Sequence, residues 1–195
     1  MPSEPLPPAV FADAYLASDD PRAQSGFRGD EPRWESARRP IVEAIDRDGT
    51  FLDVGCANGY LMESVVRWSP HRIEPYGLDF TPELVELARA RLPQWADRIF
   101  LGEVVTWEPP RSFDFARTEL VYVPEDRHRE LVDRLRSYVE TLIVCSYGSR
   151  RRNLPTDDVG GRLRSLGFEV AGELEREGRE GALLRVAWIG GGAAA

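Results

Sequence analysis

The chain has 195 residues, of which 25 are basic and 33 acidic, giving a net charge of −8 at pH 7. That length suits one domain with a proper core, and the acidic balance argues against a nucleic-acid partner. No apolar run is long enough to cross a bilayer, and residues 1–8 lack the segments of a signal peptide. We therefore expect no membrane partner and a cytoplasmic location.

All of the basic residues are arginine. The absence of lysine excludes a P-loop lysine, a pyridoxal Schiff base and a lysine nucleophile.

The first and last parts of the chain are expected to differ from its centre. Proline-rich residues 1–8 and residues 190–195 are predicted to be disordered. Residues 9–48 are predicted to form a loop over Asp19–Arg33, because proline and glycine interrupt it, and then a helix over Trp34–Arg47. Residues 49–189 are predicted to form the main domain.

A strand, a tight loop and a helix are predicted within residues 51–68. An apolar run contains Asp53, the loop contains Gly55 and Gly59, and the amphipathic stretch Tyr60–Trp68 follows. Glycine lets the backbone turn sharply and lets a ligand approach closely, and N–H groups at a helix start can face a polar ligand. The pattern predicts a ligand-binding loop, although a purely structural turn has the same sequence signature.

Further strands and helices follow in alternation. The strand at 73–78 ends at Asp79, a position where α/β sheets hold ribose hydroxyls. Thr81 and Pro82 suit the start of a helix. The predicted elements are a helix at 83–91, strands at 98–103 and 112–117, a helix at 125–138, and a strand at 141–146.

The C-terminal part predicts an antiparallel hairpin. Residues 168–177 and 182–189 both have strand character, and only the short turn 178–181 separates them. A wholly parallel dinucleotide-binding sheet would not contain this hairpin.

Two cofactor classes compete for the glycine loop. A dinucleotide fingerprint requires glycine at Ala57 and Tyr60, and both positions fail. Leu52–Gly59 instead resembles the first motif of the class I S-adenosylmethionine (SAM)-dependent methyltransferases, with Ala57 as its one departure. Alanine suits that position if its φ is negative.

The resemblance covers residues 40–189, because the later segments follow in the family's order. It implies an α/β fold: a doubly wound, seven-stranded, mostly parallel sheet with one antiparallel C-terminal strand and helices on both faces. It also implies strand 4 between strands 1 and 5. Cys56 and Cys145 would then lie two strands apart, too far for a disulfide. Two cysteines and two histidines without ligand spacing do not indicate a zinc site.

The same resemblance implies SAM as cofactor, with S-adenosylhomocysteine (SAH) as product. Asp53 would orient the loop or the methionyl amino group, Asp79 would hold the ribose and Glu103 the adenine. Alternatively, Asp53 satisfies loop N–H groups and Glu103 is a solvated charge. The implied cofactor-binding residues are Asp53, Gly55, Cys56, Ala57, Asn58, Gly59, Asp79, Phe80, Glu103 and Val104.

The acceptor is expected at the carboxyl ends of the strands. Arg117, Thr118, Glu119 and Tyr122 follow strand 4, and Ser146, Tyr147 and the run Arg150–Arg152 follow strand 5. Glu119, Tyr122 and His128 are candidate catalytic residues, as proton acceptors or substrate binders. The arginine run would suit an anionic acceptor. For all of these, a packed or solvated surface position is the alternative.

In many small members of the family, a segment like 9–48 covers the cofactor as a lid. Its contacts here would be residues 25–29 and Trp34, although an ordinary surface helix has the same pattern. The sequence thus predicts a methyltransferase that acts on an O, N or C atom of a small molecule. The alternatives are a SAM-using enzyme with non-methyl chemistry (cyclisation or decarboxylation), a non-catalytic SAM- or nucleotide-binding module, and a NAD-linked oxidoreductase, which the failed fingerprint disfavours. The sequence does not predict the oligomeric state.

Overall fold

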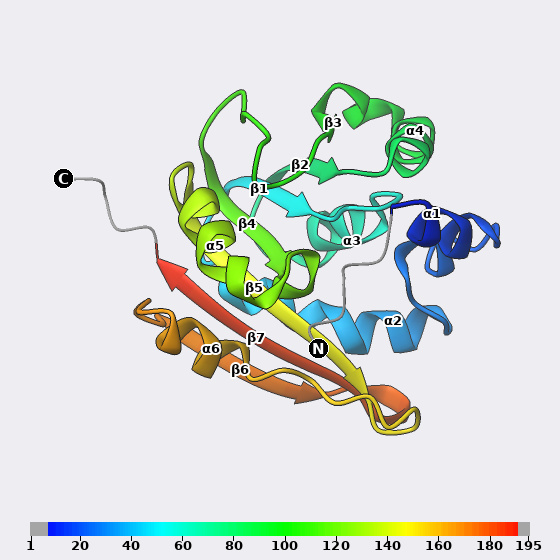
Figure 1. Ribbon diagram of the computed structural model, residues 1–195. Helices are drawn as coiled ribbons and strands as arrows, with labels where there is room; N and C mark the ends of the chain where they lie inside the picture. Colours follow the sequence, from blue (N-terminus) through cyan, green and yellow to red (C-terminus); the bar gives the residue numbers. More distant parts are fainter. Residues whose placement is uncertain (1–7, 191–195) are drawn as a thin grey trace.

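The computed structural model describes residues 8–190, which form a seven-stranded sheet with helices on both faces (Figure 1). The strand order is β3-β2-β1-β4-β5-β7-β6. β7 is antiparallel to β5 and β6, and the other neighbouring pairs are parallel. The strands are β1 Gly49–Val54, β2 Ile73–Asp79, β3 Ile99–Leu101, β4 Phe113–Glu119, β5 Val139–Ser149, β6 Gly172–Glu177 and β7 Ala182–Gly190. The predicted fold, including the antiparallel C-terminal strand, is confirmed.

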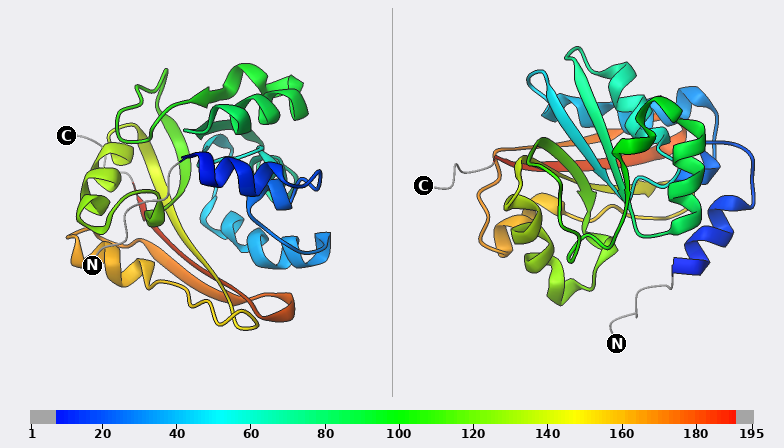
Figure 2. Two further views of the ribbon diagram at one scale, coloured as in Figure 1. Left: turned by 45° about the vertical axis from the view of Figure 1, so that its right-hand side comes forward. Right: turned by 90° about the horizontal axis from the view of Figure 1, so that it is seen from above.

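The helices form one layer on each side of the sheet. α2, α3 and α4 cover one face, and α5 and α6 cover the other (Figure 2). None within residues 8–190 is long and apolar enough to cross a membrane. The α-helices are α1 Pro8–Leu16, α2 Glu31–Arg38, α3 Tyr60–Trp68, α4 Pro82–Arg91, α5 His128–Arg136 and α6 Val159–Ser165. The 3-10 turns are η1 Ala23–Ser25, η2 Arg39–Ala44, η3 Pro93–Arg98, η4 Leu120–Tyr122, η5 Glu125–Arg127 and η6 Arg179–Gly181.

The predicted helix over 34–47 differs from the structure. α2 already begins at Glu31, because the side chain of Asp30 accepts a hydrogen bond from the Arg33 N–H at 3.0 Å and caps the helix. It gives way to η2 at Arg39. Pro40 lacks an N–H and restricts the residue before it, so the α-helix does not continue through this position.

Other boundaries also differ from the sequence-based prediction. β3 ends at Leu101, because the Glu103 carbonyl begins a turn by accepting hydrogen bonds from the N–H groups of Thr106 and Trp107. The helix predicted at 125–138 starts with η5, β5 extends to Ser149, and β6 begins only at Gly172.

The sequence analysis did not predict α6. The Asp158 side chain caps it by accepting a hydrogen bond from the Gly161 N–H at 3.0 Å. Two adjacent glycines, Gly160 and Gly161, lower its helix propensity, so the sequence pattern did not indicate a helix.

The predicted disordered ends fall mostly on residues 1–7 and 191–195, which lie outside the described residues. At the two borders, Pro8 belongs to α1 and Gly190 to β7.

The pairing of β1 with β4 positions the site. Asp53 of β1 lies in register with Arg117 of β4. At the opposite end of this pair, the Asp114 carboxylate accepts hydrogen bonds from the Thr50 N–H and hydroxyl, both at 2.8 Å. Burial opposes the ionised form, but these bonds and the nearby Arg47 outweigh it and lower the pKa of Asp114.

Replacing Asp114 by asparagine should lower the free energy of unfolding at neutral pH by about 1–2 kcal/mol, because charge-assisted hydrogen bonds are lost. A lowered pKa stabilises the folded state above the ordinary value of 3.8, and this contribution disappears as pH falls through the folded-state pKa. Denaturant unfolding at several pH values should therefore show the difference from wild type narrowing below that value. Asp46→Asn is the control, since Asp46 is exposed and pairs with its neighbour Arg47; an equal loss in both variants would contradict the role of Asp114.

Candidate active site

A cavity of about 200 Å³ lies at the carboxyl ends of β1, β4 and β5. Its lining comes from three parts of the chain: the loop after β1, the ends of β4 and β5 with η4, and the N-terminal segment with α2. The polar and charged residues that line this central cavity include Tyr15, Ser25, Arg38, Asp53, Arg117, Glu119, Tyr122 and Tyr147.

The loop after β1 turns sharply at Gly55 and Gly59. Both have a left-handed backbone, with φ of 76° and 73°. A Cβ at Gly55 would lie 2.5 Å from the Tyr122 hydroxyl, and one at Gly59 would lie 2.7 Å from Leu92 Cδ1. Both positions therefore need glycine for conformation and for space.

Ala57 also has a left-handed backbone, with φ of 48°. The condition under which alanine would suit this position, a negative φ, is therefore not met. An L-residue with a Cβ costs about 1–2 kcal/mol in this conformation. The Asp79 carboxylate fixes it, because Oδ2 accepts a hydrogen bond from the Ala57 N–H at 2.8 Å.

Asp79 is almost fully buried, and its carboxylate accepts hydrogen bonds from backbone N–H groups. Its second oxygen, Oδ1, accepts a hydrogen bond from the Thr81 N–H at 2.9 Å. Burial raises the pKa of Asp79, while these backbone hydrogen bonds oppose the rise. Asp79 thus orders the loop after β1, and its predicted contact with a ribose stays a prediction.

Asp53 and Arg117 form a buried ion pair that lines the central cavity. Arg117 Nη1 lies 3.4 Å from Asp53 Oδ1, and the two side chains are 3% and 1% exposed. Asp53 Oδ2 and Arg117 Nε are buried without a hydrogen-bond partner among the residues whose side chains are described. Burial raises the pKa of Asp53 to about 7, against the opposing effect of Arg117.

Glu119 and Tyr122, two of the candidate catalytic residues, lie together beside Arg117. Glu119 accepts hydrogen bonds from Arg117 Nη2 and, at 3.0 Å, from the Tyr122 hydroxyl. Arg117 also donates to the hydroxyl oxygens of Tyr122 at 3.2 Å and Tyr147 at 3.0 Å. Burial raises the pKa of Tyr122 well above its usual value. At neutral pH, Tyr122 is therefore a hydrogen-bond donor and no base.

The third candidate, His128, is not among the residues that line the central cavity. It begins α5, and its Nδ1 accepts a hydrogen bond from Arg162 Nε at 3.2 Å. Burial and the charge of Arg162 lower its pKa. The structure thus brings together only Glu119 and Tyr122 of the three.

The predicted cofactor-binding residues divide into three groups. Asn58, Gly59 and Asp79 shape or hold the loop after β1 and are not among the residues that line the central cavity. Asp53, Gly55, Cys56 and Ala57 line the central cavity. Phe80, Glu103 and Val104 lie beyond the ends of β2 and β3, where Phe80 and Glu103 are exposed and Val104 is buried. Cys56 and Cys145 are both free and buried, and burial raises the pKa of the Cys56 thiol well above its usual range. Among the described residues, no cluster of three or more potential ligands could hold a metal.

Asn58 joins the N-terminal segment to the loop after β1. Its fully buried amide Nδ2 donates to the Pro21 carbonyl at 2.9 Å and to Gln24 Oε1 at 3.1 Å, and its Oδ1 accepts from the Ser25 hydroxyl at 2.5 Å. Ser25, Gly26 and Trp34 line the central cavity, so the segment predicted as a lid lies against the site.

Arg38 is a lining residue that the sequence analysis did not identify. It comes from α2, 79 residues before Arg117 in the chain, and no motif surrounds it. The arginine run that suggested an anionic acceptor lies elsewhere: Arg150 pairs with Glu177 at 2.9 Å, and Arg151 pairs with Glu180. Both of these arginines are exposed.

Comparison with known proteins distinguishes between the cofactor classes. A family model described as a methyltransferase domain matches residues 51–141. A curated relative, trans-aconitate 2-methyltransferase of Methylobacterium radiotolerans, is 34% identical over 111 residues, or 53% of this chain. The chain spans 41% of that relative's length. The resemblance to SAM-dependent methyltransferases is confirmed.

Two solved structures share the fold. Magnesium protoporphyrin IX methyltransferase from Synechocystis, with bound SAM, has a TM-score of 0.63 at 14% identity, covering 97% of this chain and 100% of its own. The cyclase SpnF has a TM-score of 0.66 at 14% identity, covering 97% of each chain. SAM is the cofactor that these comparisons support.

The residues of the central cavity fit this cofactor. Asp53 lines the cavity, and its oxygen Oδ2, which has no hydrogen-bond partner among the residues whose side chains are described, is an acceptor for a cationic group. SAM carries both a sulfonium and an ammonium, which an ionised carboxylate favours.

Replacing Ala57 by glycine should relieve the left-handed strain. We expect the free energy of unfolding to be unchanged or up to about 1 kcal/mol higher than in the wild type. Relief of the strain at least compensates for the additional chain entropy that glycine loses on folding. Ala88→Gly is the control: Ala88 is equally buried but lies in α4, so that variant should lose at least about 1 kcal/mol. Equal losses in urea unfolding would show that φ at residue 57 carries no strain.

The affinity for SAM should rise with pH. Because the pKa of Asp53 is about 7, its carboxylate becomes ionised, and attracts the cation, between about pH 6 and pH 7.5. Calorimetry should show a several-fold increase over that interval in the wild type and a flat, weaker affinity in Asp53→Asn. A wild-type affinity that does not change with pH would remove Asp53 from the cation site.

Proposed function

We propose that the protein transfers a methyl group from SAM to an O, N or C atom of a small-molecule acceptor by in-line displacement, releasing SAH. One observation carries the proposal: the loop after β1 and the polar pair Glu119 and Tyr122 line the same cavity. A cofactor on that loop and an acceptor beside that pair would lie next to each other, which is the main requirement of the reaction.

The residues of the cavity suit distinct tasks. When bound, SAM supplies a methyl group already activated on a sulfonium. Asp53 offers a carboxylate oxygen to the cation. Tyr122 orients the acceptor by hydrogen bonding, since its raised pKa keeps it protonated. Glu119 accepts the proton that an O–H or N–H acceptor gives up, because its side chain is 21% exposed and reaches the cavity.

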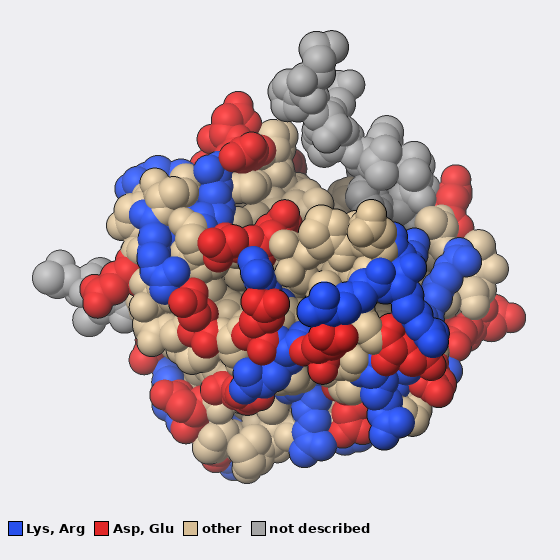
Figure 3. Space-filling model, turned by 90° about the horizontal axis from the view of Figure 1, so that it is seen from below, with Lys and Arg blue, Asp and Glu red and all other residues tan. Residues whose placement is uncertain are grey.

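A small acid is the acceptor class with the most support. The curated relative is named for trans-aconitate, and the cavity of about 200 Å³ suits a small molecule. A nucleic acid would favour a continuous basic surface. On the face seen in Figure 3, arginine alternates with aspartate and glutamate, so that face offers no basic stripe.

A second candidate is a non-methyl reaction on the same fold, and the likeness to the cyclase SpnF favours it. Incubation with SAM and a panel of small acids, phenols and amines, followed by mass analysis, separates the candidates. SAH together with a methylated acceptor supports the proposal. Methylthioadenosine supports the non-methyl route, and unchanged SAM that nevertheless binds supports a binding module.

Glu119→Gln should lower turnover by about 10²–10⁴-fold if Glu119 is the general base. Tyr122→Phe should lower it less, because only an orienting hydrogen bond is lost. Both variants should bind SAM as the wild type does, since Asp53 and the loop remain. Steady-state kinetics with an acceptor from the panel, alongside calorimetry of SAM, measures both effects.

Two further variants complete this test. Glu125→Gln is the control, because Glu125 is exposed and pairs with Arg162. His128→Asn should also retain turnover, given its position outside the cavity. Loss of turnover in His128→Asn alone would return the catalytic role to His128 and contradict the assignment of Glu119.

A further inference from the structure

Arg38 lines the central cavity, and aromatic rings surround its guanidinium. Its Cζ lies 3.6 Å from the centre of the Tyr147 ring, 5.3 Å from that of Trp34 and 5.2 Å from that of Phe27. Aromatic faces hold a guanidinium in place without neutralising it. Arg38 is partly buried, and burial lowers the pKa of its guanidinium.

No carboxylate lies within 4.0 Å of Arg38 among the residues whose side chains are described. Its one hydrogen bond in that part of the chain goes from Nη1 to the carbonyl of Ala37, at 3.2 Å. The other arginine in the cavity differs sharply: Arg117 contacts both Asp53 and Glu119. The carboxylates of the cavity therefore gather at Arg117, and Arg38 keeps donors to offer.

We propose that Arg38 binds the carboxylate of a ligand in the central cavity. The inference rests on the proposed function and adds the residue that recognises an anion there. A guanidinium presents parallel N–H donors that match a carboxylate, and the pairing is strong where water is scarce. Two sources could supply this carboxylate: the methionyl group of SAM or SAH, and the acceptor.

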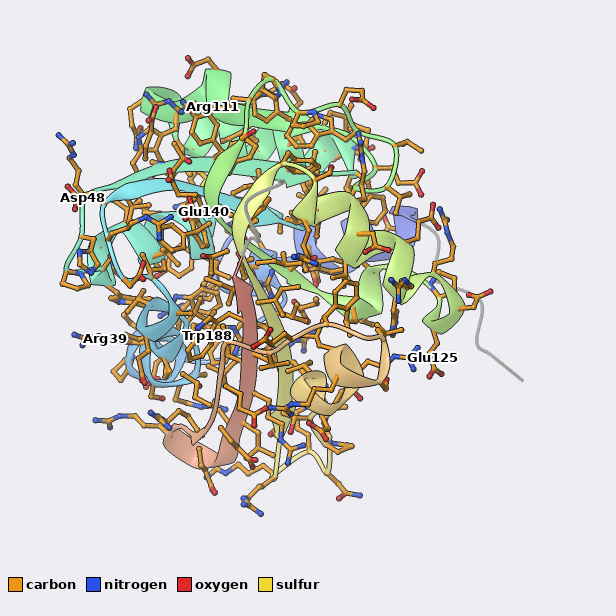
Figure 4. All side chains as sticks on the ribbon, turned by 90° about the vertical axis from the view of Figure 1, so that its left-hand side faces the viewer. Arg39, Asp48, Arg111, Glu125, Glu140 and Trp188 are labelled. Carbon is orange, nitrogen blue, oxygen red and sulfur yellow. The ribbon has the colours of Figure 1, made fainter. Side chains whose placement is uncertain are left out.

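Calorimetry on the full chain distinguishes the sources with three probes. SAH carries the methionyl carboxylate, 5′-methylthioadenosine keeps the adenosine and thioether without it, and trans-aconitate is added to protein saturated with SAH. The variants are Arg38→Gln, which removes the charge, and Arg38→Lys, which keeps the charge but loses the paired donors. Arg39→Gln is the control: Arg39 is exposed, pairs with Glu35 and points away from the protein body (Figure 4).

The proposal predicts a loss of at least about tenfold in affinity for one carboxylate probe in Arg38→Gln, a smaller loss in Arg38→Lys and none in Arg39→Gln. Weaker binding of SAH with unchanged binding of methylthioadenosine assigns Arg38 to the cofactor carboxylate. Unchanged SAH with weaker trans-aconitate assigns it to the acceptor.

Three results would count against these assignments in different ways. Unchanged binding of SAH and trans-aconitate in Arg38→Gln overturns the inference and leaves the proposed function standing. Equal losses for SAH and methylthioadenosine also overturn it, since they indicate a merely structural role. A wild-type protein that binds neither SAM nor SAH overturns the proposed function itself.

Discussion

The arrangement of the site depends on one buried cation, Arg117. A guanidinium removed from water costs several kcal/mol unless charged and polar partners surround it. Arg117 obtains these partners from different elements: Asp53 from β1, Glu119 from the end of β4, Tyr122 from η4 and Tyr147 from β5. Because each partner must stay within hydrogen-bond distance, this network fixes the ends of three neighbouring strands and the turn that follows them. The rest of the cavity is built on this arrangement.

Polar side chains also hold the loop after β1, through hydrogen bonds from two sides. Asp79 binds the Ala57 N–H from the end of β2, while Asn58 is tied to the N-terminal segment through Pro21, Gln24 and Ser25. Of the three left-handed residues in this loop, only Ala57 has a Cβ and therefore a steric cost, and the Asp79 hydrogen bond offsets that cost. The N-terminal segment thus does more than cover the site. It shares in fixing the loop, so its ordering and the shape of the cavity are physically coupled.

The sequence was sufficient to predict the structural features that depend on residues close together in the chain. The strand, loop and helix at 49–68 could be predicted because apolar periodicity and glycine positions lie within one short stretch. The sequence was insufficient to predict contacts between segments that are far apart in the chain. The backbone of Ala57 depends on a carboxylate 22 residues away, and Arg38 reaches the cavity only through the packing of α2 on the sheet. The ion pairs of Arg150 and Arg151 could not be predicted for the same reason, because their glutamate partners come from β6 and η6.

Tyr147 explains how two arginines can share one small cavity. Its hydroxyl accepts a hydrogen bond from Arg117, while the face of its ring carries Arg38 at 3.6 Å. Arg117 Cζ also lies over this ring, 5.3 Å from its centre, so Tyr147 contacts both cations. Their other partners differ: Arg117 contacts carboxylates, and Arg38 lies among aromatic rings. As a result, the cavity has an acidic end at Asp53 and Glu119 and a basic end at Arg38. Such a field favours a ligand whose cationic and anionic groups are separated in space, because each then meets the opposite charge. The side chains that create this field lie on β1, β4, β5 and α2, and the shared fold alone would not provide it.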